Sequence, residues 1–498
     1  MADDDRRMET KRSSQTPALF VFESSMMNPA ATTSRPNLTQ GSILKALLTL
    51  ALPIVFGNLL QTGYQLVDAF WVGRLGAGAV AAVAVSFPIN FLLVALGSGF
   101  SVAGSVLVAQ NYGARNLPMV NHIVVQTLVL ETGLALVLTV VAHLGSPLIL
   151  RLIGVGPDIF AQADQFQRIL FLGLAFNFGF LMFQALMRGV GEVRIPLYIN
   201  IGTLALNFLL DPLFIYGWGP VPGLGVAGAA MATVVTQFLS MAVGMAVLLR
   251  GRSGIKLSFK GFKPDFPLMR RAVKLGVPSS IELSARALGL SVMTVLAASF
   301  GTTVLATYGI GSRILALGII PALGISLACS TLVAQNIGAR NLPRAVQTAN
   351  YAIGISFGGL LVVGVLGYLA AVPLVNFFLK GDEAVSRDAV EFVRIAVFSL
   401  CFTGAQQSVS GALRGSGNTL AAMMLTIIGV WVFQFPVAWY LSQHTALGFH
   451  GLWWSFVISN VLAATLALLW YRRGDWQGPH LADPLQRKAD VVTPIEQS

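Results

Sequence analysis

The chain has 498 residues, of which 55% are hydrophobic and only 11% are charged, and its mean hydropathy is +0.73. Soluble domains carry roughly 25% charged residues, so this composition excludes an ordinary soluble protein and indicates a membrane protein. The formal net charge of +11 is spread over many short loops, which favours a role in membrane topology over a surface for nucleic acid. We therefore expect the lipid bilayer, and no nucleic acid, among its partners.

Apolar stretches long enough to cross a bilayer recur along the whole chain. A spanning helix needs about 20 predominantly apolar residues, and a helix satisfies its own backbone amides where lipid offers them no partner. The sequence predicts twelve such helices, at 43–72, 79–110, 119–146, 161–188, 195–216, 226–249, 270–300, 304–336, 345–375, 388–413, 419–441 and 450–471.

Positive charge is distributed unevenly between the two ends of these predicted helices. Twelve spans place both termini on one side, and short cytoplasmic loops are enriched in Lys and Arg. The side of the termini carries both basic tails, the basic central loop, and Arg115, Arg188, Arg194, Arg340, Arg344 and Arg414 in its shorter loops. The opposite loops hold only Arg74, Arg151, Lys380 and Arg387. We predict a multi-pass inner-membrane protein with both termini in the cytoplasm.

The chain contains an internal sequence repeat, so that its two halves correspond to each other. Residues Val108–Pro118 read VAQNYGARNLP, and Val333–Pro343 read VAQNIGARNLP 225 positions later. Nearly the same offset relates Pro53 to Pro278 and several other positions. Because six is an even number, both halves enter the membrane from the same side, which makes a parallel repeat with its axis along the membrane normal. Two such lobes around a central cleft suit transport by alternating access.

The repeat and the polar segments together predict the organisation of the chain. The fold is expected to be an all-α integral membrane fold of twelve transmembrane helices in two parallel-repeat six-helix lobes. The expected segments are a disordered cytoplasmic tail at 1–42, the N-terminal lobe at 43–249, a basic cytoplasmic linker at 250–269, the C-terminal lobe at 270–472 and a cytoplasmic tail at 473–498.

Two carboxylates belong to the first half alone. Asp68 lies in the first predicted span and Asp211 in the fifth, whereas the repeat places Met293 and Phe435 at the matching positions. A charged group at bilayer depth costs roughly 2.5–3.5 kcal/mol on insertion scales, so such residues are rare and usually functional. We therefore expect both aspartates to have a functional role.

Each aspartate ends a polar stripe with helical spacing. The stripes are Asn58, Gln61, Tyr64 and Asp68 in the first span, and Asn200, Thr203, Asn207 and Asp211 in the fifth. Residues three or four apart share one helical face, so both stripes are predicted to meet inside the N-terminal lobe. For Gln61, Thr203 and Asn200, simple hydrogen bonding between helices is an equally good interpretation.

The two aspartates predict a site for a coupling ion. Two carboxyl groups in one low-dielectric cavity cannot both ionise cheaply, so they are expected to share a proton. With Asn207 and Thr233 as neutral oxygen donors, the same site suits Na⁺ instead. Pro53 removes a backbone hydrogen bond within the first span, so protonation of Asp68 is hypothesised to bend this helix. A static kink is an equally valid interpretation.

The remaining polar residues of the spans carry weaker signals. Glu282 and Arg286 are four apart, which favours a structural ion pair, although Arg286 matches Gln61 in the repeat and so is aimed at the cleft. Glu131 stands alone in the third span. Arg168 and Arg394 are expected to reach towards the membrane surface, and Cys329 and Cys401 to be buried apolar side chains rather than a disulfide.

Several motifs together resemble the multidrug and toxin extrusion (MATE) family. They are VDAFWVGRLG at Val67–Gly76, VAQN-x-GARN in both halves, LRGSGN ending at Asn418, and NFLLDPLFIYG at Asn207–Gly217. The resemblance covers about residues 43–472. It implies twelve helices in two lobes, a V-shaped outward-open state, and export of amphipathic, often cationic compounds in exchange for H⁺ or Na⁺.

The resemblance also implies roles for particular residues. Asp68 resembles the essential aspartate of the first helix, and the rest of the N-lobe polar network corresponds to Tyr64, Asn207, Asp211 and Thr233. Pro53 resembles the family's bending proline, and the positions lining the substrate cavity correspond to Gln61 and Gln184. The polar stripe of the fifth span adds Thr203 to this candidate cavity, and the repeat adds Arg286.

The chain departs from one branch of the family in its second half. Where sodium-coupled pumps carry acids on the seventh and tenth helices, this chain has Arg286 and Gly404. It therefore resembles the DNA-damage-inducible branch, and no cation site is expected in the C-terminal lobe.

Other functions fit the sequence less well. A flippase for lipid-linked oligosaccharides, the alternative transport function, would line its cleft with several basic residues to hold a pyrophosphate, and the central spans offer chiefly Arg286 and Arg313. An enzyme would need a nucleophile with its base or a metal cluster, and the sequence has neither at helical spacing. A channel would need a pore motif. We expect a monomeric transporter of small molecules that needs no cofactor and binds no metal beyond the coupling ion.

Overall fold

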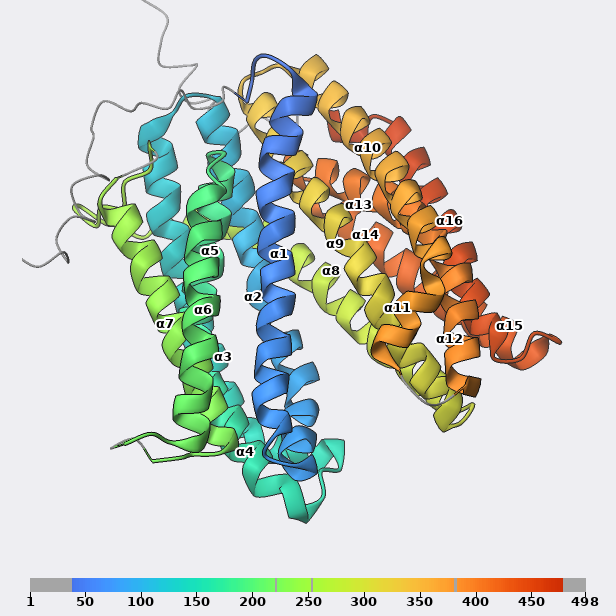
Figure 1. The fold of residues 1–498 in the computed structure, drawn as a ribbon. Helices are drawn as coiled ribbons and strands as arrows, with labels where there is room; N and C mark the ends of the chain where they lie inside the picture. Colours follow the sequence, from blue (N-terminus) through green and yellow to red (C-terminus); the bar gives the residue numbers. More distant parts are fainter. Residues whose placement is uncertain (1–37, 220–221, 252–253, 380–382, 478–498) are drawn as a thin grey trace, which may run out of the picture. The chain divides into compact units, whose positions relative to one another are not determined.

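The computed structural model describes residues 38–219, 222–251, 254–379 and 383–477, and within these ranges the chain is built from helices (Figure 1). Most of the two predicted tails, part of the linker and Lys380 lie outside the described residues. The first half consists of α1 (Ile43–Gly73), α2 (Ala77–Gly113), α3 (Leu117–Ile153), α4 (Pro157–Leu172), α5 (Leu174–Gly189), α6 (Arg194–Tyr216) and α7 (Val226–Leu249). The second half consists of α8 (Phe266–Ala298), α9 (Thr302–Gly338), α10 (Leu342–Leu369), α11 (Ala371–Phe378), α12 (Glu383–Ala396), α13 (Ser399–Ser416), α14 (Thr419–Ile427), a π-helix (Ile428–Gln434), α15 (Phe435–His444) and α16 (His450–Arg472).

The helices agree with a polytopic membrane protein. In the described part of the chain, ten helices are long and apolar enough to cross a bilayer, with α14 to α15 counted as one, and the pair α4 and α5 makes an eleventh span bent by 45°. The predicted single span at 388–413 is broken into α12 and α13, the repeat counterparts of α4 and α5. The charged side chains of α12 lower the mean hydropathy of this pair, which takes the place of the bent span α4–α5 in the second half and completes the twelve predicted helices. The architecture is therefore all-α, with two repeated lobes, α1 to α7 and α8 to α16.

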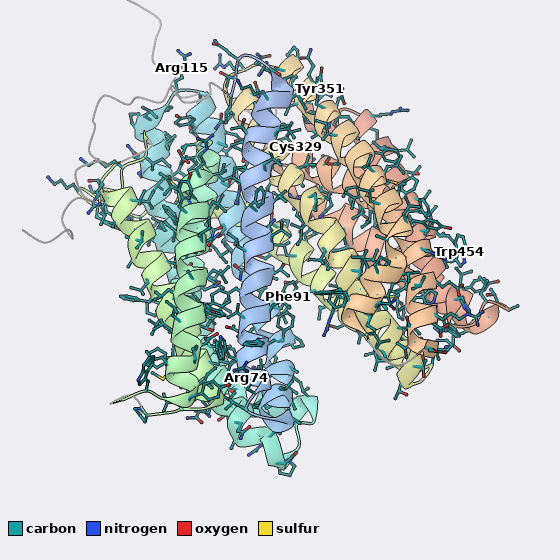
Figure 2. The ribbon with its side chains drawn as sticks, viewed as in Figure 1. Arg74, Phe91, Arg115, Cys329, Tyr351 and Trp454 are labelled. Carbon is teal, nitrogen blue, oxygen red and sulfur yellow. The ribbon has the colours of Figure 1, made fainter. Side chains whose placement is uncertain are left out.

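The repeated VAQN-x-GARN motif builds the same helix connection in both halves. Arg115 and Arg340 adopt left-handed conformations with φ of 59° and 58°, which is uncommon for residues other than glycine. The next residue then caps the following helix: Asn116 accepts a hydrogen bond from the amide of Met119, and Asn341 accepts one from the amide of Arg344. An N-cap of this kind stabilises a helix by about 1 kcal/mol. Figure 2 shows Arg115 and Arg74 at opposite ends of the first half, and we call the former the Arg115 end.

The same motif joins the two lobes at the Arg115 end. Gln110 on α2 donates from Nε2 to the carbonyl oxygen of Gly415 at 3.2 Å, and Gln335 on α9 donates to that of Gly189 at 2.8 Å. Each glutamine therefore binds the end of a helix in the other lobe. Gly113 and Gly338 allow this approach, because a Cβ on either one would overlap the backbone carbonyl of the glutamine in the other lobe.

Apolar packing strengthens the joint between the lobes. The first turns of α1 contribute Leu47 and Leu50 to a buried cluster that also contains Cys329 and Leu332 of α9. Each leucine is completely buried, and full burial of such a side chain stabilises a fold by about 1.5–3 kcal/mol. The lobes thus share a core at this end as well as hydrogen bonds.

The start of α8 is held to the first lobe by a capping aspartate. Asp265 accepts a hydrogen bond from the amide of Leu268 at 3.0 Å and lies 3.0 Å from His122 Nε2. Burial alone would raise the pKa of Asp265, but the Leu268 amide and the His122 ring outweigh it and hold this pKa below its ordinary value. Asp265 is therefore more acidic in the folded protein than in an unfolded chain.

Candidate functional site

The polar stripes of α1 and α6 meet inside the N-terminal lobe, together with polar residues of α7. The hydroxyl groups of Tyr64 on α1 and Thr236 on α7 lie 2.7 Å apart and share a hydrogen bond. Tyr64 also interacts with Thr233 of α7 and with the carboxyl group of Asp68, one turn further along its own helix. This contact links the first helix to α7.

The two aspartates lie next to each other across the contact between α1 and α6. Asp211 and Asn207 are completely buried, and Asn207 Nδ2 donates to Asp211 Oδ1 at 3.1 Å. The half-buried carboxyl group of Asp68 is close enough to both of them to interact electrostatically. The structure therefore brings together the five residues that the sequence singled out for ion coupling: Tyr64, Asp68, Asn207, Asp211 and Thr233.

Several oxygen atoms of this cluster have no hydrogen-bond partner among the described residues. Among the described residues, Asp68 Oδ1, Asp211 Oδ2 and Asn207 Oδ1 are buried and have no hydrogen-bond partner. A buried acceptor without a donor costs about 1–3 kcal/mol, and more when it is charged. A proton shared between the carboxyl groups would relieve part of this cost, and so would a small hard cation, which prefers carboxylate and amide oxygens. In the described part of the chain, no group of three or more His, Cys, Asp or Glu side chains is arranged to hold a metal ion.

The other residues of the predicted cavity lie outside this cluster. Gln61 is exposed on α1, and Gln184 is half-buried on α5. The hydroxyl group of Thr203 donates to the carbonyl oxygens of Ile199 and Asn200 in its own helix. The structure thus gives Thr203 a local partner, whereas Gln61 and Gln184 carry no hydrogen bond to the aspartates within the described residues. Pro53 lies inside α1, which continues through it as one helix from Ile43 to Gly73.

A second buried network occupies the C-terminal lobe and corrects one expectation. Arg414 was expected in a loop, but it lies in the last turn of α13 with 7% of its side chain exposed. Its Nη1 is 3.1 Å from Glu282 Oε1 and its Nη2 is 2.9 Å from the hydroxyl of Ser326. Arg286 is 3.8 Å from the same Glu282 oxygen and donates to Gln407 Oε1 at 2.9 Å. The main partner of Glu282 is therefore Arg414, because α13 extends far enough for its last turn to reach into the lobe.

Three of the remaining ionisable residues of the spans, Glu131, Arg168 and Arg394, have local partners. Glu131 is buried and accepts a hydrogen bond from the hydroxyl of Ser101 at 2.8 Å. Arg168 forms an ion pair with Asp164 at 2.9 Å. Arg394 lies over the ring of Tyr368 at 5.4 Å, Arg188 lies half-buried in the last turn of α5, and Cys329 and Cys401 are free and buried.

Sequence reasoning missed two members of these networks. Thr236 is three residues after Thr233 and therefore lies on the same face of α7. This spacing alone could have identified Thr236 as a member of the polar cluster. Arg414 could not be found in this way, because its partner Glu282 is 132 positions away in the sequence.

Comparison with known proteins agrees with this architecture. The MatE family model matches residues 53–213 and 278–440, once in each half. The chain is 30% identical to the "Probable multidrug resistance protein YoeA" of Bacillus subtilis over 451 residues, which cover 89% of this chain and 97% of the relative. It is 27% identical to the "Probable multidrug resistance protein NorM" of Thermotoga maritima, covering 87% of this chain and 93% of the relative. A solved structure described as the outward-facing conformation of a multidrug resistance MATE family transporter superposes with a TM-score of 0.83 at 27% identity, covering 89% of this chain and 98% of the other.

Proposed function

Because the chain belongs to the MatE family, we propose that it is a secondary transporter that exports amphipathic, often cationic small molecules in exchange for H⁺ or Na⁺. The named relatives are multidrug resistance proteins, and they support export of drugs and toxins rather than catalysis. They give no support to a flippase for lipid-linked oligosaccharides. The protein works by alternating access in the inner membrane, as a monomer with the Arg115 end and both termini in the cytoplasm.

One observation carries the coupling mechanism: the paired carboxyl groups of Asp68 and Asp211, which have unused oxygen atoms. Binding of one proton or one Na⁺ changes the net charge of this cluster by one unit. In a low-dielectric interior, such a change alters the preferred packing of the helices that carry the two acids. The cluster therefore couples ion binding to the arrangement of α1 against α6.

The helix α1 is the element that transmits this change. It holds Asp68 and Tyr64 near one end, and its other end packs into the apolar cluster shared by the two lobes. Pro53 lies between these two regions and removes one backbone hydrogen bond, so α1 bends there more easily than elsewhere. Rearrangement around Asp68 thus reaches the joint between the lobes.

The test is transport by the purified protein in liposomes. A proton gradient and a sodium gradient are imposed separately, and export of a cationic dye is followed by fluorescence. Asp68→Asn keeps the size of the side chain but removes its charge, and we expect it to abolish gradient-driven export. The matched control is Asp158→Asn, the same substitution at an exposed position in the first turn of α4, which should export normally.

Two results would contradict this proposal. Normal export by Asp68→Asn would exclude Asp68 as the coupling residue. If neither gradient drove any solute across the membrane in the unmodified protein, ion-coupled export itself would be wrong. If only one of the two gradients is effective, that result identifies the coupling ion.

A further inference from the structure

The interior of the C-terminal lobe holds more positive than negative charge. Among the described residues, Glu282 is the only acidic partner of Arg286 and Arg414. Arg188 of the first lobe is near enough to repel Arg414, and it has no ion-pair partner in the described ranges. Two guanidinium groups against one carboxylate, with Arg188 nearby in the first lobe, leave a surplus of positive charge around Glu282, and unpaired charge inside a membrane protein is costly.

Arg286 is the member of this group that an incoming molecule reaches. Its side chain is 29% exposed, against 7% for Arg414. Residues four apart share one face of a helix, so Arg286 lies on the same face of α8 as Glu282 and Leu290. Glu282 is completely buried and Leu290 is 51% exposed. Along this face the side chains therefore change from buried at Glu282 to exposed at Leu290, with Arg286 at the boundary.

The guanidinium group of Arg286 has unused hydrogen-bond donors. It carries five N–H groups, and the partners that the structure gives it in the described ranges are Gln407 and, more weakly, Glu282. Its other donor nitrogens are not fully buried, so an incoming group can reach them. An arginine with free donors on a planar group fits a carboxylate through two parallel hydrogen bonds.

We propose that Arg286, oriented by Gln407, forms a subsite for one singly charged anionic group. The occupant is the carboxylate of an amphipathic substrate or a small free anion such as chloride. Arg414 is fixed by Glu282 and Ser326, so it contributes positive potential rather than a contact. A single accessible guanidinium matches one negative charge, which distinguishes this subsite from a pyrophosphate site.

The subsite deepens the proposed function and rests on it only in taking the substrates to be amphipathic molecules. Substrates with both a cationic and an anionic group would meet acids in the N-terminal lobe and an arginine in the C-terminal lobe. The chain would thus accept zwitterionic compounds in addition to cations.

The test measures binding in lipid nanodiscs, without any gradient. The probes are rhodamine B, which carries a free carboxylate, and its ethyl ester, which does not, and binding is followed by fluorescence anisotropy. The unmodified protein should bind the acid more tightly than the ester. Arg286→Gln should weaken binding of the acid at least about tenfold, the size of one lost charge-assisted hydrogen bond, and should leave binding of the ester unchanged.

Two further variants make the result specific. Arg286→Lys keeps the charge but loses the two parallel hydrogen bonds, so it should retain a reduced preference for the acid. It also provides the comparison if Arg286→Gln folds poorly. Arg168→Gln changes the net charge of the chain by the same amount from the other lobe and should behave like the unmodified protein.

The outcomes distinguish a free anion from a substrate carboxylate as the occupant. They also distinguish failure of the subsite from failure of the proposed function. Displacement of rhodamine B by chloride but not by gluconate assigns the subsite to small anions too, whereas no displacement assigns it to the carboxylate of the substrate. Equal binding of acid and ester by the unmodified protein would overturn the subsite, and so would an equal loss of both in Arg286→Gln. Neither result affects gradient-driven export of the ester, which tests the proposed function separately.

Discussion

Replacement of Gly338 by alanine should separate the two lobes at the Arg115 end. A Cβ atom on Gly338 would overlap the carbonyl oxygen of Gln110 and lie 2.6 Å from its carbonyl carbon. Both partners are helix backbone, so neither can move aside as a flexible side chain would. Since carbon atoms pack about 3.5–4.0 Å apart, the two backbones must separate by roughly 1 Å.

The size of the effect follows from the cost of overpacking. One extra methyl group in a well-packed contact costs about 1–3 kcal/mol. Because 1.4 kcal/mol corresponds to a factor of ten in an equilibrium constant, the ratio of closed to open forms at this end should fall roughly five- to 150-fold. The hydrogen bonds of Gln110 and Gln335 lie within the same contact and should be lost together with it.

The assay measures the distance between the lobes. Spin labels at Leu117→Cys on α3 and Gln347→Cys on α10 occupy exposed positions at the Arg115 end, and pulsed dipolar spectroscopy reports their separation. We expect Gly338→Ala to add or enlarge a long-distance population. The matched control is Gly309→Ala on the same helix, where a Cβ meets nothing within 4 Å. Identical distance distributions for the two alanine variants would refute the reasoning.

Three further predictions concern single contacts. Glu282→Gln leaves the buried Arg414 without its counter-charge, which should destabilise the protein by about 3–5 kcal/mol and lower the thermal unfolding midpoint in detergent; an unchanged midpoint would be inconsistent with the pair. Tyr64→Phe removes the hydroxyl that bonds to Thr236, and the expected loss is about 0.5–1.5 kcal/mol in the same measurement, whereas a larger loss would indicate a wider network. The folded-state pKa of Asp265 is depressed, so its stabilising effect is present above about pH 3.9, its value in an unfolded chain, and disappears as the pH falls through the lower folded value. Asp265→Asn should therefore be less stable than the unmodified protein at pH 7, and the gap should close on acidification towards pH 3; a gap that stays constant would contradict this assignment.

The fold and the N-terminal cluster could be predicted because their signals are local or repeated. Hydropathy over about 20 residues predicts a span without knowledge of its neighbours. The spacing of Asn207 and Asp211 places them on one helical face, and Asp68 is conspicuous because its repeat partner is an apolar methionine. The cost of a polar stripe on a lipid-facing surface also predicts that the two faces meet, and the structure adds the contact with α7 through Thr236.

The rest depends on contacts between distant parts of the chain. Arg414 was predicted in a loop, since a basic residue near the end of a span looks the same whether it faces water or a buried acid. The predicted span at 388–413 is interrupted between α12 and α13, where Val397 and Phe398 form a turn within an apolar sequence. The repeat of Gln110 and Gln335 was visible, but their hydrogen bonds to the opposite lobes became apparent only from the structure.

The reciprocal pairing of these glutamines has a mechanical consequence. Each lobe supplies one donor and one acceptor, and the repeat relates the two bonds by a pseudo-twofold operation. A rigid rotation about an axis equidistant from the two bonds therefore stretches both by a similar amount. Opening of the lobes about such an axis breaks both hydrogen bonds together rather than one after the other.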